Sequence, residues 1–415
     1  MPQVKPEIET FAKIKVIGVG GSGGSAVDRM VKNGIRGVDF IVMNTDVQAL
    51  HHNSAPHKLH IGKAVTRGLG AGMDPDVGRR SAEEAQNEIR EALKDADMVF
   101  VTCGLGGGTG SGASPVIAEI ARDLGALTVA VVTRPFSFEG QERKAIADKA
   151  FQELAKHVDT IITIPNDRVL QIIDKKTSLL EAFRIVDDVL RQGVQGISEL
   201  ITVPGLINVD FADVRTIMFD SGSALMGIGV GKGENRAADA AKAAIASPLL
   251  EISIDGARGI LFTITGGPDL GMQEVAEAAK IITASADENA KVIFGAVIDE
   301  SFGDDVRITV IATNFGDRER ERQAFSLDDE ETPMFSHKKS LQPPSFFGKK
   351  TPAETTPRET PASSFVTKRV IPDGSSDISA GAIPSFEKKA APEKGDTGQD
   401  DDLEIPAFIR RKMGV

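Results

Sequence analysis

The chain has 415 residues, more than one ordinary domain needs, and a formal net charge of −12. This excess of acid argues against general nucleic-acid binding, because phosphate contacts need a basic surface. Its single cysteine, Cys103, excludes internal disulfides and fits a reducing compartment, and we find neither a signal peptide nor an apolar run of membrane-spanning length. We therefore expect a cytoplasmic protein without direct membrane insertion.

Residues 11–205 alternate short apolar runs with segments of helical periodicity. Strands are expected at 14–18, 38–43, 98–102, 127–132 and 160–164, and helices at 25–33, 79–94, 115–124, 141–156 and 178–202. This alternation predicts an α/β fold with a largely parallel sheet covered by helices on both faces. The loops at the carboxyl ends of such strands converge on one ligand.

A glycine cluster follows the first predicted strand. Gly18, Gly20 and Gly23 fit the pattern Gly-x-Gly-x-x-Gly, and the next strand is followed by an acid, Asp46. The pattern is typical of dinucleotide sites, although Asp46 lies further along than the usual spacing. The cluster alone therefore leaves an NAD(P)-dependent oxidoreductase as an alternative.

The most informative segment is 104–112, which has six glycines in nine residues. It follows the apolar run 98–102 and precedes an expected helix start, with Ser114 as the cap and Pro115 in the first helical position. Glycine lets backbone N–H groups crowd around an oxyanion, and a helix N-terminus favours negative charge. The segment has no lysine and is therefore not a Gly-x-x-x-x-Gly-Lys-Ser/Thr loop. Phosphate would be held by N–H groups and the Thr109 hydroxyl.

A third glycine-rich loop, 68–72, is expected at the same edge of the sheet, together with the loops 44–46, 133–143 and 165–168. One ligand with several phosphates would explain all three glycine-rich loops. The alternative is that the glycines serve only tight strand–helix packing, which would be costly in folding entropy.

The second half of the chain changes in character. The helix 178–202 is long and is expected to form the spine between two domains. After it, strands are expected at 223–230, 259–265, 292–298 and 306–312, with alanine-rich helices at 235–247 and 272–286. This pattern predicts a smaller α+β domain for packing or assembly rather than chemistry.

The last part of the chain is rich in proline, with half of the 20 prolines after residue 316. Its few aliphatic residues cannot offset the entropy of ordering, so 317–399 is expected to be disordered. Segments 333–339, 344–350 and 384–389 each carry Pro, one residue, Phe and then two bases, as does 406–411. These repeats either are weak copies of a docking peptide or arise by chance in a low-complexity sequence.

The loop Gly104–Gly112, the segment Asn44-Thr45-Asp46 and the segment 204–213 together resemble the FtsZ family, the bacterial relatives of tubulin. The end of the chain, 402–411, is similar to that family's C-terminal docking peptide. The resemblance implies a GTPase that polymerises head to tail into the filaments of the division ring at mid-cell. It also implies GTP or GDP with Mg²⁺, and membrane-tethering and regulatory division proteins that bind residues 403–415.

The resemblance further implies roles for individual residues. The phosphates would be held by the two glycine clusters, the base read by Asn166 and Asp187 with Phe183 stacked on it, and the ribose region contacted by Glu139 and Arg143. The complete implied binding set is Gly20, Gly21, Ser22, Gly23, Gly24, Ser25, Asn44, Gly70, Ala71, Gly72, Gly104, Gly107, Gly108, Thr109, Gly110, Thr133, Glu139, Arg143, Asn166, Phe183 and Asp187.

The implied catalytic residues are Asp210 and Asp213, acting in a neighbouring subunit's site, with Asn208. A carboxylate beside the attacking water suffices, because phosphoryl transfer asks mainly for positioning and charge stabilisation. From the residues alone, Asp210 or Asp213 could instead cap the helix that runs into 214–218. In the same way, Asp187 and Arg143 could be ordinary solvated helix charges.

These interpretations divide the chain as follows: 1–11 disordered, 12–177 GTP-binding, 178–202 central helix, 203–219 catalytic loop and following helix, 220–316 assembly domain, 317–399 disordered linker and 400–415 docking peptide. Besides the oxidoreductase, a nucleotide-binding scaffold without turnover remains an alternative. Asp187 and the 204–213 loop discriminate against the oxidoreductase, in which neither has a role.

Overall fold

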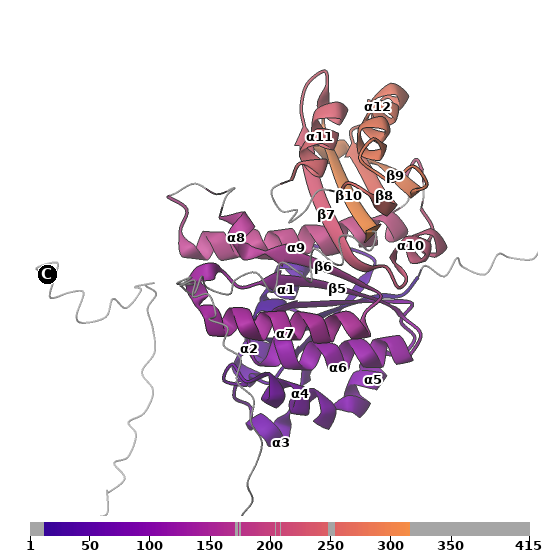
Figure 1. Ribbon diagram of the computed structural model, residues 1–415. Coiled ribbons are helices and arrows are strands. Elements are labelled where there is room, and N and C mark those ends of the chain that lie inside the picture. Colours follow the sequence, from indigo (N-terminus) through magenta and orange to yellow (C-terminus); the bar gives the residue numbers. More distant parts are fainter. Residues whose placement is uncertain are drawn as a thin grey trace, which may run out of the picture. The chain divides into compact units, whose positions relative to one another are not determined.

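The computed structural model describes residues 12–170, 173, 176–203, 205–207, 209–247 and 254–315. They form a mixed ten-stranded sheet with helices on its faces (Figure 1). The predicted disordered segments 1–11 and 317–399, the predicted docking peptide and Asn208 lie outside the described residues.

Seven neighbouring strands of the sheet are parallel. Their order is β3-β2-β1-β4-β5-β6-β7, with bounds β1 Ile14–Val19, β2 Val38–Asn44, β3 His57–His60, β4 Met98–Gly104, β5 Leu127–Arg134, β6 Thr160–Pro165 and β7 Gly222–Gly231. The central strands read as continuous apolar runs because both of their faces are buried. All five strands predicted in this half are confirmed, and the short edge strand β3 was not predicted.

Helices of the first half cover both faces of these strands. They are α1 Gly20–Lys32, α2 Val47–His52, α3 Lys63–Thr66, α4 Pro75–Glu84, α5 Gln86–Leu93, α6 Thr109–Asp123, α7 Gln141–His157, α8 Asn166–Val169 and α9 Leu179–Thr202. The helix predicted at 79–94 is wrong in detail, because it begins at Pro75, after the cap Asp74, and breaks at Ala85. The sequence around Ala85 offers no physical reason for this break.

The predicted start of α6 is also wrong. The helix begins at Thr109, inside the glycine-rich segment, so Pro115 lies within the helix and Ser114 is not its cap. The Ser114 hydroxyl instead donates to the carbonyl oxygen of Gly110 at 2.6 Å. Every residue from Thr109 to Ala118 is buried, and this close packing outweighs the low helix propensity of glycine. In the same way, α1 begins at Gly20 rather than at residue 25.

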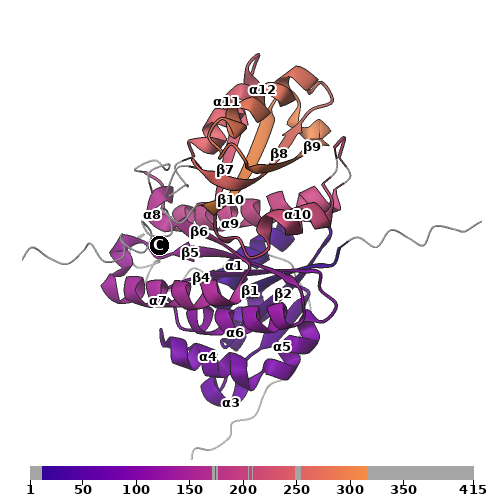
Figure 2. The same cartoon turned by 45° about the vertical axis from the view of Figure 1, so that its right-hand side comes forward.

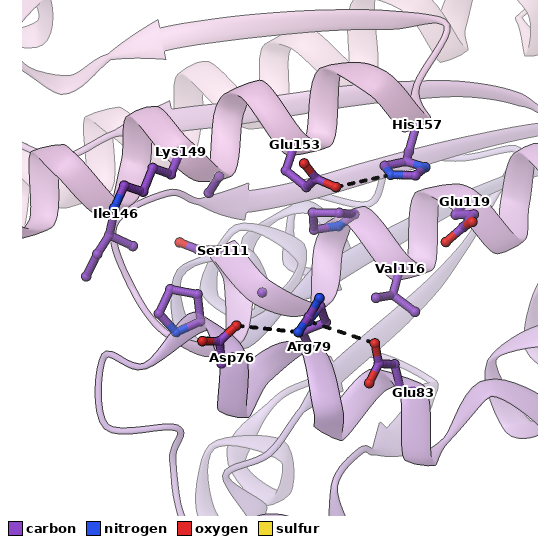
Figure 3. Close-up of a pocket in the computed structure, with 14 residues that line it drawn as sticks. Asp76, Arg79, Glu83, Ser111, Val116, Glu119, Ile146, Lys149, Glu153 and His157 are labelled. Carbon is purple, nitrogen blue, oxygen red and sulfur yellow. Dashed lines mark ion pairs between the residues drawn. The ribbon is translucent and has the colours of Figure 1, made fainter.

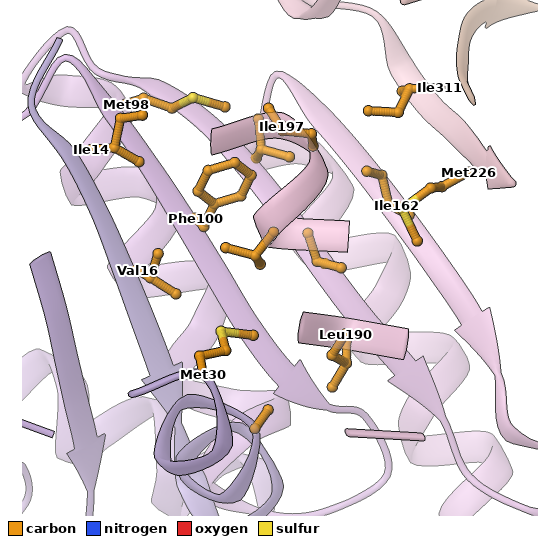
Figure 4. Close-up of a cluster of buried hydrophobic side chains, with 14 of the residues drawn as sticks. Ile14, Val16, Met30, Met98, Phe100, Ile162, Leu190, Ile197, Met226 and Ile311 are labelled. Carbon is orange, nitrogen blue, oxygen red and sulfur yellow. The ribbon is translucent and has the colours of Figure 1, made fainter. Parts of the chain in front are cut away.

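Alternate residues along each strand enter two different cores. Val16 and Phe100 pack with Met30 of α1 and with Leu190 and Ile197 of α9 on one face (Figure 4). The next residues along the strands, among them Ile17 and Val101, pack on the other face against α5, α6 and α7. This alternation is the period of two that a strand imposes.

The smaller part of the fold continues the same sheet. Strand β7 lies next to β6 in the sheet and pairs antiparallel with β10 (Val306–Phe315) on its other side. Strand β10 then pairs antiparallel with β8 (Ala257–Gly266), and β8 pairs parallel with the last strand, β9 (Lys291–Ile298). Helices α11 (Arg236–Ile245) and α12 (Met272–Thr283) pack on this part, as predicted (Figure 2).

Helix α9 lies between the two parts, as predicted for the spine (Figures 1 and 2). Its hydroxyl cap Ser178 accepts from the Glu181 N–H at 3.2 Å, and its 24 residues make it about 36 Å long. Gly193 and Gly196 of α9 let Met226 and Thr309 approach the helix closely. Within the described ranges, no helix is long and apolar enough to cross a membrane.

Candidate nucleotide site

The carboxyl ends of β1, β4, β5 and β6 open into a cavity of about 360 Å³, here called the glycine cleft. Most of the predicted binding residues line it: Gly21, Ser22, Ala71, Gly72, Gly104, Gly107, Gly108, Thr109, Gly110, Thr133, Glu139, Arg143, Asn166, Phe183 and Asp187. They come from segments up to 166 positions apart in the chain, which the parallel topology brings to one edge.

A second cavity of about 470 Å³, here called the α1 pocket, adjoins the glycine cleft and shares Gly21, Phe183 and Asp187 with it. The α1 pocket contains four more predicted residues, Gly20, Gly24, Ser25 and Asn44. Gly23 and Gly70 line neither cavity. At Gly23, an added Cβ would lie 2.3 Å from the Thr102 carbonyl oxygen, so this glycine serves the packing of α1 on β4.

The glycines of the cleft do two different things. At Gly20 and Gly108 they allow close approach, since a Cβ at Gly20 would lie 2.9 Å from the Gly110 nitrogen and one at Gly108 would lie 2.8 Å from the Asp74 nitrogen. At Gly21 and Gly107, a Cβ would meet nothing within 4 Å. Gly20 and Gly108 therefore allow the backbone segments to pack closely, whereas Gly21 and Gly107 leave space in which a ligand could contact the backbone.

Two helices begin at the cleft, α1 at Gly20 and α6 at Thr109. Neither has a side-chain cap or an acid in its first turn. The N–H groups of a first helical turn have no partner within the helix, and the helix dipole makes that end positive. Two uncapped helix ends at one cavity are suited to an anion with several charged groups.

Asp187 of α9 stands at the junction of the two cavities. Its carboxylate accepts from the Arg29 guanidinium at 3.2 Å. Burial raises the pKa of Asp187 to about 6, against the opposing effect of the Arg29 charge. Sequence analysis missed Arg29, although it lies one helical turn after Ser25 on the same face of α1 and could have been found from that spacing.

Asn166 and Phe183 complete this end of the cleft. Asn166 is 5 % exposed, and its side-chain oxygen is buried without a hydrogen-bond partner, an arrangement that a ligand donor would satisfy. Phe183 is 39 % exposed and meets Phe136 edge to face at 5.5 Å between ring centroids. A ring and an unsatisfied acceptor beside a carboxylate are suited to a planar, nitrogen-rich base.

Other predicted residues are engaged within the protein. Glu139 accepts from Arg143 at 3.0 Å and from the Phe136 N–H at 2.9 Å. The side-chain oxygen of Asn44 accepts from the Thr45 and Asp46 N–H groups and so shapes the turn after β2. Ser22 accepts from the Gly104 N–H at 2.8 Å and joins the two glycine clusters.

Asp210 and Asp213 lie on the opposite side from the cleft, at the amino ends of the strands. Asp213 belongs to α10 (Phe211–Met218), and Asp210 directly precedes it. This helix packs where β6 begins, since the Met218 carbonyl accepts from Thr160. About 22 Å of helix separates Asp187 from the end of α9, which leads to this segment. Asp210 caps α10 by accepting from the Asp213 N–H at 2.8 Å, so the capping interpretation is confirmed for Asp210. Neither acid lines the glycine cleft.

A larger cavity, of about 610 Å³, lies between α4, α6 and α7 (Figure 3). Its ion pairs join residues one turn apart on a single helix, such as Arg79 with Asp76 and Glu83, at 3.7–3.9 Å. Such exposed pairs are ordinary surface features. Volume alone therefore does not identify the site, and the uncapped helices and bare glycines favour the smaller glycine cleft. Across the part of the chain that the structure describes, no three His, Cys, Asp or Glu residues gather as a metal site.

Comparison with known proteins agrees with this geometry. Residues 13–174 match the GTPase domain of the Tubulin/FtsZ family, and residues 222–316 match the FtsZ family C-terminal domain. An empty FtsZ dimer from M. jannaschii is 46 % identical, covers 75 % of this chain and 90 % of its own, and superposes with a TM-score of 0.72. A mutant of that protein gives 45 % identity, covers 75 % of this chain and 93 % of its own, and has the same TM-score.

Two proteins from Haloferax volcanii share the fold at lower identity. A GDP-bound CetZ1 monomer is 22 % identical with a TM-score of 0.66, and it covers 76 % of this chain and 100 % of its own. A GTPγS-bound CetZ2 protofilament is 23 % identical with a TM-score of 0.64, and it covers 77 % of this chain and 100 % of its own.

Proposed function

The chain belongs to the FtsZ family of filament-forming GTPases of cell division, and we propose from this premise how its own residues bind and hydrolyse GTP. The glycine cleft binds the phosphates, and the wall around Asp187 reads the base. The attacking water is positioned by Asp210 and Asp213 of the next subunit. The observation that carries the proposal is that these acids and the cleft lie at opposite ends of the strands, so one subunit cannot bring them together.

The phosphate end of the proposed site is formed by backbone. The uncapped starts of α1 and α6 supply N–H donors, and the open positions Gly21 and Gly107 leave the space that phosphate oxygens would fill. The Thr109 hydroxyl adds a side-chain donor. A bound Mg²⁺ would be held mainly by the β- and γ-phosphate oxygens and would neutralise charge there.

The base end selects guanine. Guanine presents two neighbouring donors, N1–H and the N2 amino group, and one carboxylate accepts from both, whereas adenine offers no such pair. Asp187 supplies that carboxylate beside the ring of Phe183. The unpaired side-chain oxygen of Asn166 provides a further acceptor nearby.

The water-orienting acids come from another chain. A subunit that adds head to tail would bring the α10 edge of one copy onto the cleft edge of the next, a heterologous contact that builds a filament. Large exposed apolar side chains lie beside both edges, Leu69, Phe138 and Leu180 near the cleft and Leu206 and Phe219 near α10. Such side chains favour association.

Mixing two inactive variants tests this arrangement. Asp213→Ala keeps an intact cleft but lacks one acid. Gly107→Asp adds a carboxylate at the phosphate end, where a Cβ would meet nothing within 4 Å, and keeps the acids; Gly107→Asn is its uncharged control. Each variant alone should hydrolyse GTP poorly. The mixture should recover activity, because the cleft of one variant meets the acids of the other.

Failure of the mixture to exceed the sum of the separate variants would contradict catalysis across the interface. The same conclusion would follow if dilute monomer hydrolysed GTP as fast per subunit as concentrated protein. Recovery in the mixture with no activity in dilute monomer would support both parts of the proposal.

We further propose that residues 403–415 bind membrane-tethering and regulatory division proteins at the mid-cell ring. This segment carries apolar Ile405, Phe408 and Ile409 next to Arg410 and Arg411, a pattern suited to docking in a groove. Deleting 403–415 should abolish most partner binding while GTP hydrolysis persists. Replacing Phe335, Phe346 and Phe386 by Ser should speed dissociation several-fold if the repeats are weak copies, and an unchanged off-rate would assign them to chance.

A further inference from the structure

We propose that Thr45 is a positioning residue for GTP hydrolysis, because its hydroxyl fixes the hydroxyl of Thr109 at the phosphate end of the glycine cleft. The inference rests on the proposed function, in which Thr109 donates to a phosphate oxygen. Thr45 itself is fully buried and lines neither cavity. Its action is therefore on Thr109 and not on the nucleotide.

The contact between the two threonines is short and buried. Their Oγ1 atoms are 2.8 Å apart, and the residues are 64 positions apart in the chain. The bond joins the turn after β2 to the first residue of α6. Among the residues that the structure describes, neither hydroxyl has another hydrogen-bond partner. Thr109 lines the cleft, so its remaining hydrogen-bonding capacity faces the site.

The backbone of Thr45 is held firmly enough to aim its hydroxyl. The Thr45 N–H donates to the Asn44 side-chain oxygen at 2.8 Å, and the Thr45 carbonyl lies 3.2 Å from Nε2 of His60. A carbonyl can only accept, so this contact requires the tautomer of His60 with its proton on Nε2. On the other side, Asp46 caps α2 by accepting from the Gln48 and Ala49 N–H groups.

A bound phosphate would set the direction of the hydrogen bonds, because a phosphate oxygen only accepts. Each hydroxyl has one proton to donate and two lone pairs. If Thr45 donates to Thr109, the proton of Thr109 is left for an acceptor in the cleft, and a phosphate oxygen is such an acceptor. The chain from Thr45 to Thr109 to phosphate is cooperative, since each bond polarises the next. Without the Thr45 hydroxyl, the Thr109 side chain loses its only fixed partner in the described structure.

Two substitutions in the full-length protein separate the hydroxyl from the volume of Thr45. Thr45→Val keeps the shape and removes the hydroxyl, and Thr45→Ser restores the hydroxyl. We expect Thr45→Val to lower kcat for GTP and the affinity for GTPγS by about three- to tenfold. Thr45→Ser should recover most of both. Thermal unfolding without nucleotide reports on the fold, and Thr45→Ala replaces Thr45→Val if the latter does not fold.

A double-mutant cycle with Thr109→Val tests the coupling. Thr45→Val should cost little further in the Thr109→Val background, because the residue on which it acts is gone. Fully additive losses, a silent Thr45→Val, or no rescue by Thr45→Ser would each overturn the inference. If Thr109→Val itself left GTP binding and hydrolysis unchanged, the phosphate role of Thr109 would fail first. An effective Thr109→Val with a silent Thr45→Val would overturn only the role of Thr45.

Discussion

The ionisation of Asp187 should control guanine binding in a way that pH can reveal. With a pKa of about 6, this carboxyl is about 90 % ionised at pH 7 and about 10 % ionised at pH 5. Only the carboxylate accepts from both guanine donors, so a proton and the nucleotide compete for Asp187. Affinity should therefore rise with pH up to about 7 and then level off, falling about tenfold from pH 7 to pH 5.

Removing the charge of Asp187 by substitution should also weaken nucleotide binding, by an amount that can be calculated. Hydrogen bonds to a charged group contribute about 1.5–3 kcal/mol each. Losing one such bond in Asp187→Asn should weaken binding at pH 7.5 by roughly 10- to 150-fold. Asp187→Ala loses both bonds and should weaken binding at least as much. The asparagine variant keeps the size of the side chain, so a loss in it reports on charge rather than on packing.

The assay is a titration with GDP, which carries the same base and has no γ-phosphate to be hydrolysed during the measurement. Asp187→Asn is also the control for every other titrating group, including the terminal phosphate of GDP. A pH dependence that persisted in Asp187→Asn would therefore not belong to Asp187. Equal affinity for ATP and GTP, or a flat pH profile in the parent, would refute the guanine assignment.

Three further predictions concern catalysis and folding. Mixing a small proportion of Asp213→Ala into the parent protein should lower GTP turnover, measured as phosphate release, in proportion to the junctions that lack the acid, and an unchanged turnover would contradict a role for Asp213. Gly20→Ala should lower the free energy of unfolding by about 1–3 kcal/mol in urea titrations, because φ is +72° there and the Gly110 nitrogen is 2.9 Å from the new Cβ; Gly21→Ala, in open space, is the control. Arg236→Met should cost about 2–3 kcal/mol, since it leaves Glu274 and Asp269 without their buried partner. Arg236 donates to both carboxylate oxygens of Glu274, and an Arg236→Lys variant as stable as the parent would exclude a role for this bidentate contact.

Much of the fold could be predicted because buried strands and helices require apolar residues at regular positions in the sequence. Strands such as β4 read as unbroken apolar runs, and α9 carries an apolar stripe after the cap Ser178. The edge strand β3 was missed because His-Lys-Leu-His is short and half exposed. The start of α6 was placed too late because propensity disfavours glycine in helices, whereas the packing of α6 needs it.

The candidate site also has features that could be predicted from the sequence and features that could not. Its glycine segments could be found because they are contiguous in sequence, and parallel topology predicts that they meet. Pairs such as Arg29 with Asp187, or Thr45 with Thr109, join residues from distant segments. No local pattern encodes such a pair, so the engagement of Asp187 by Arg29 and of Thr109 by Thr45 could be learned only from the structure.

The placement of α10 opposite the cleft has an arithmetical consequence for a filament. If every complete catalytic centre needs a cleft from one copy and acids from the next, a single-stranded row always has one fewer centre than it has subunits. A pair should then turn over GTP at half the rate per copy of a long row. One terminal copy always holds its nucleotide uncleaved, so the two ends of the row differ chemically whatever its length. Fragmentation, which multiplies ends without changing total protein, should lower turnover by the number of junctions lost.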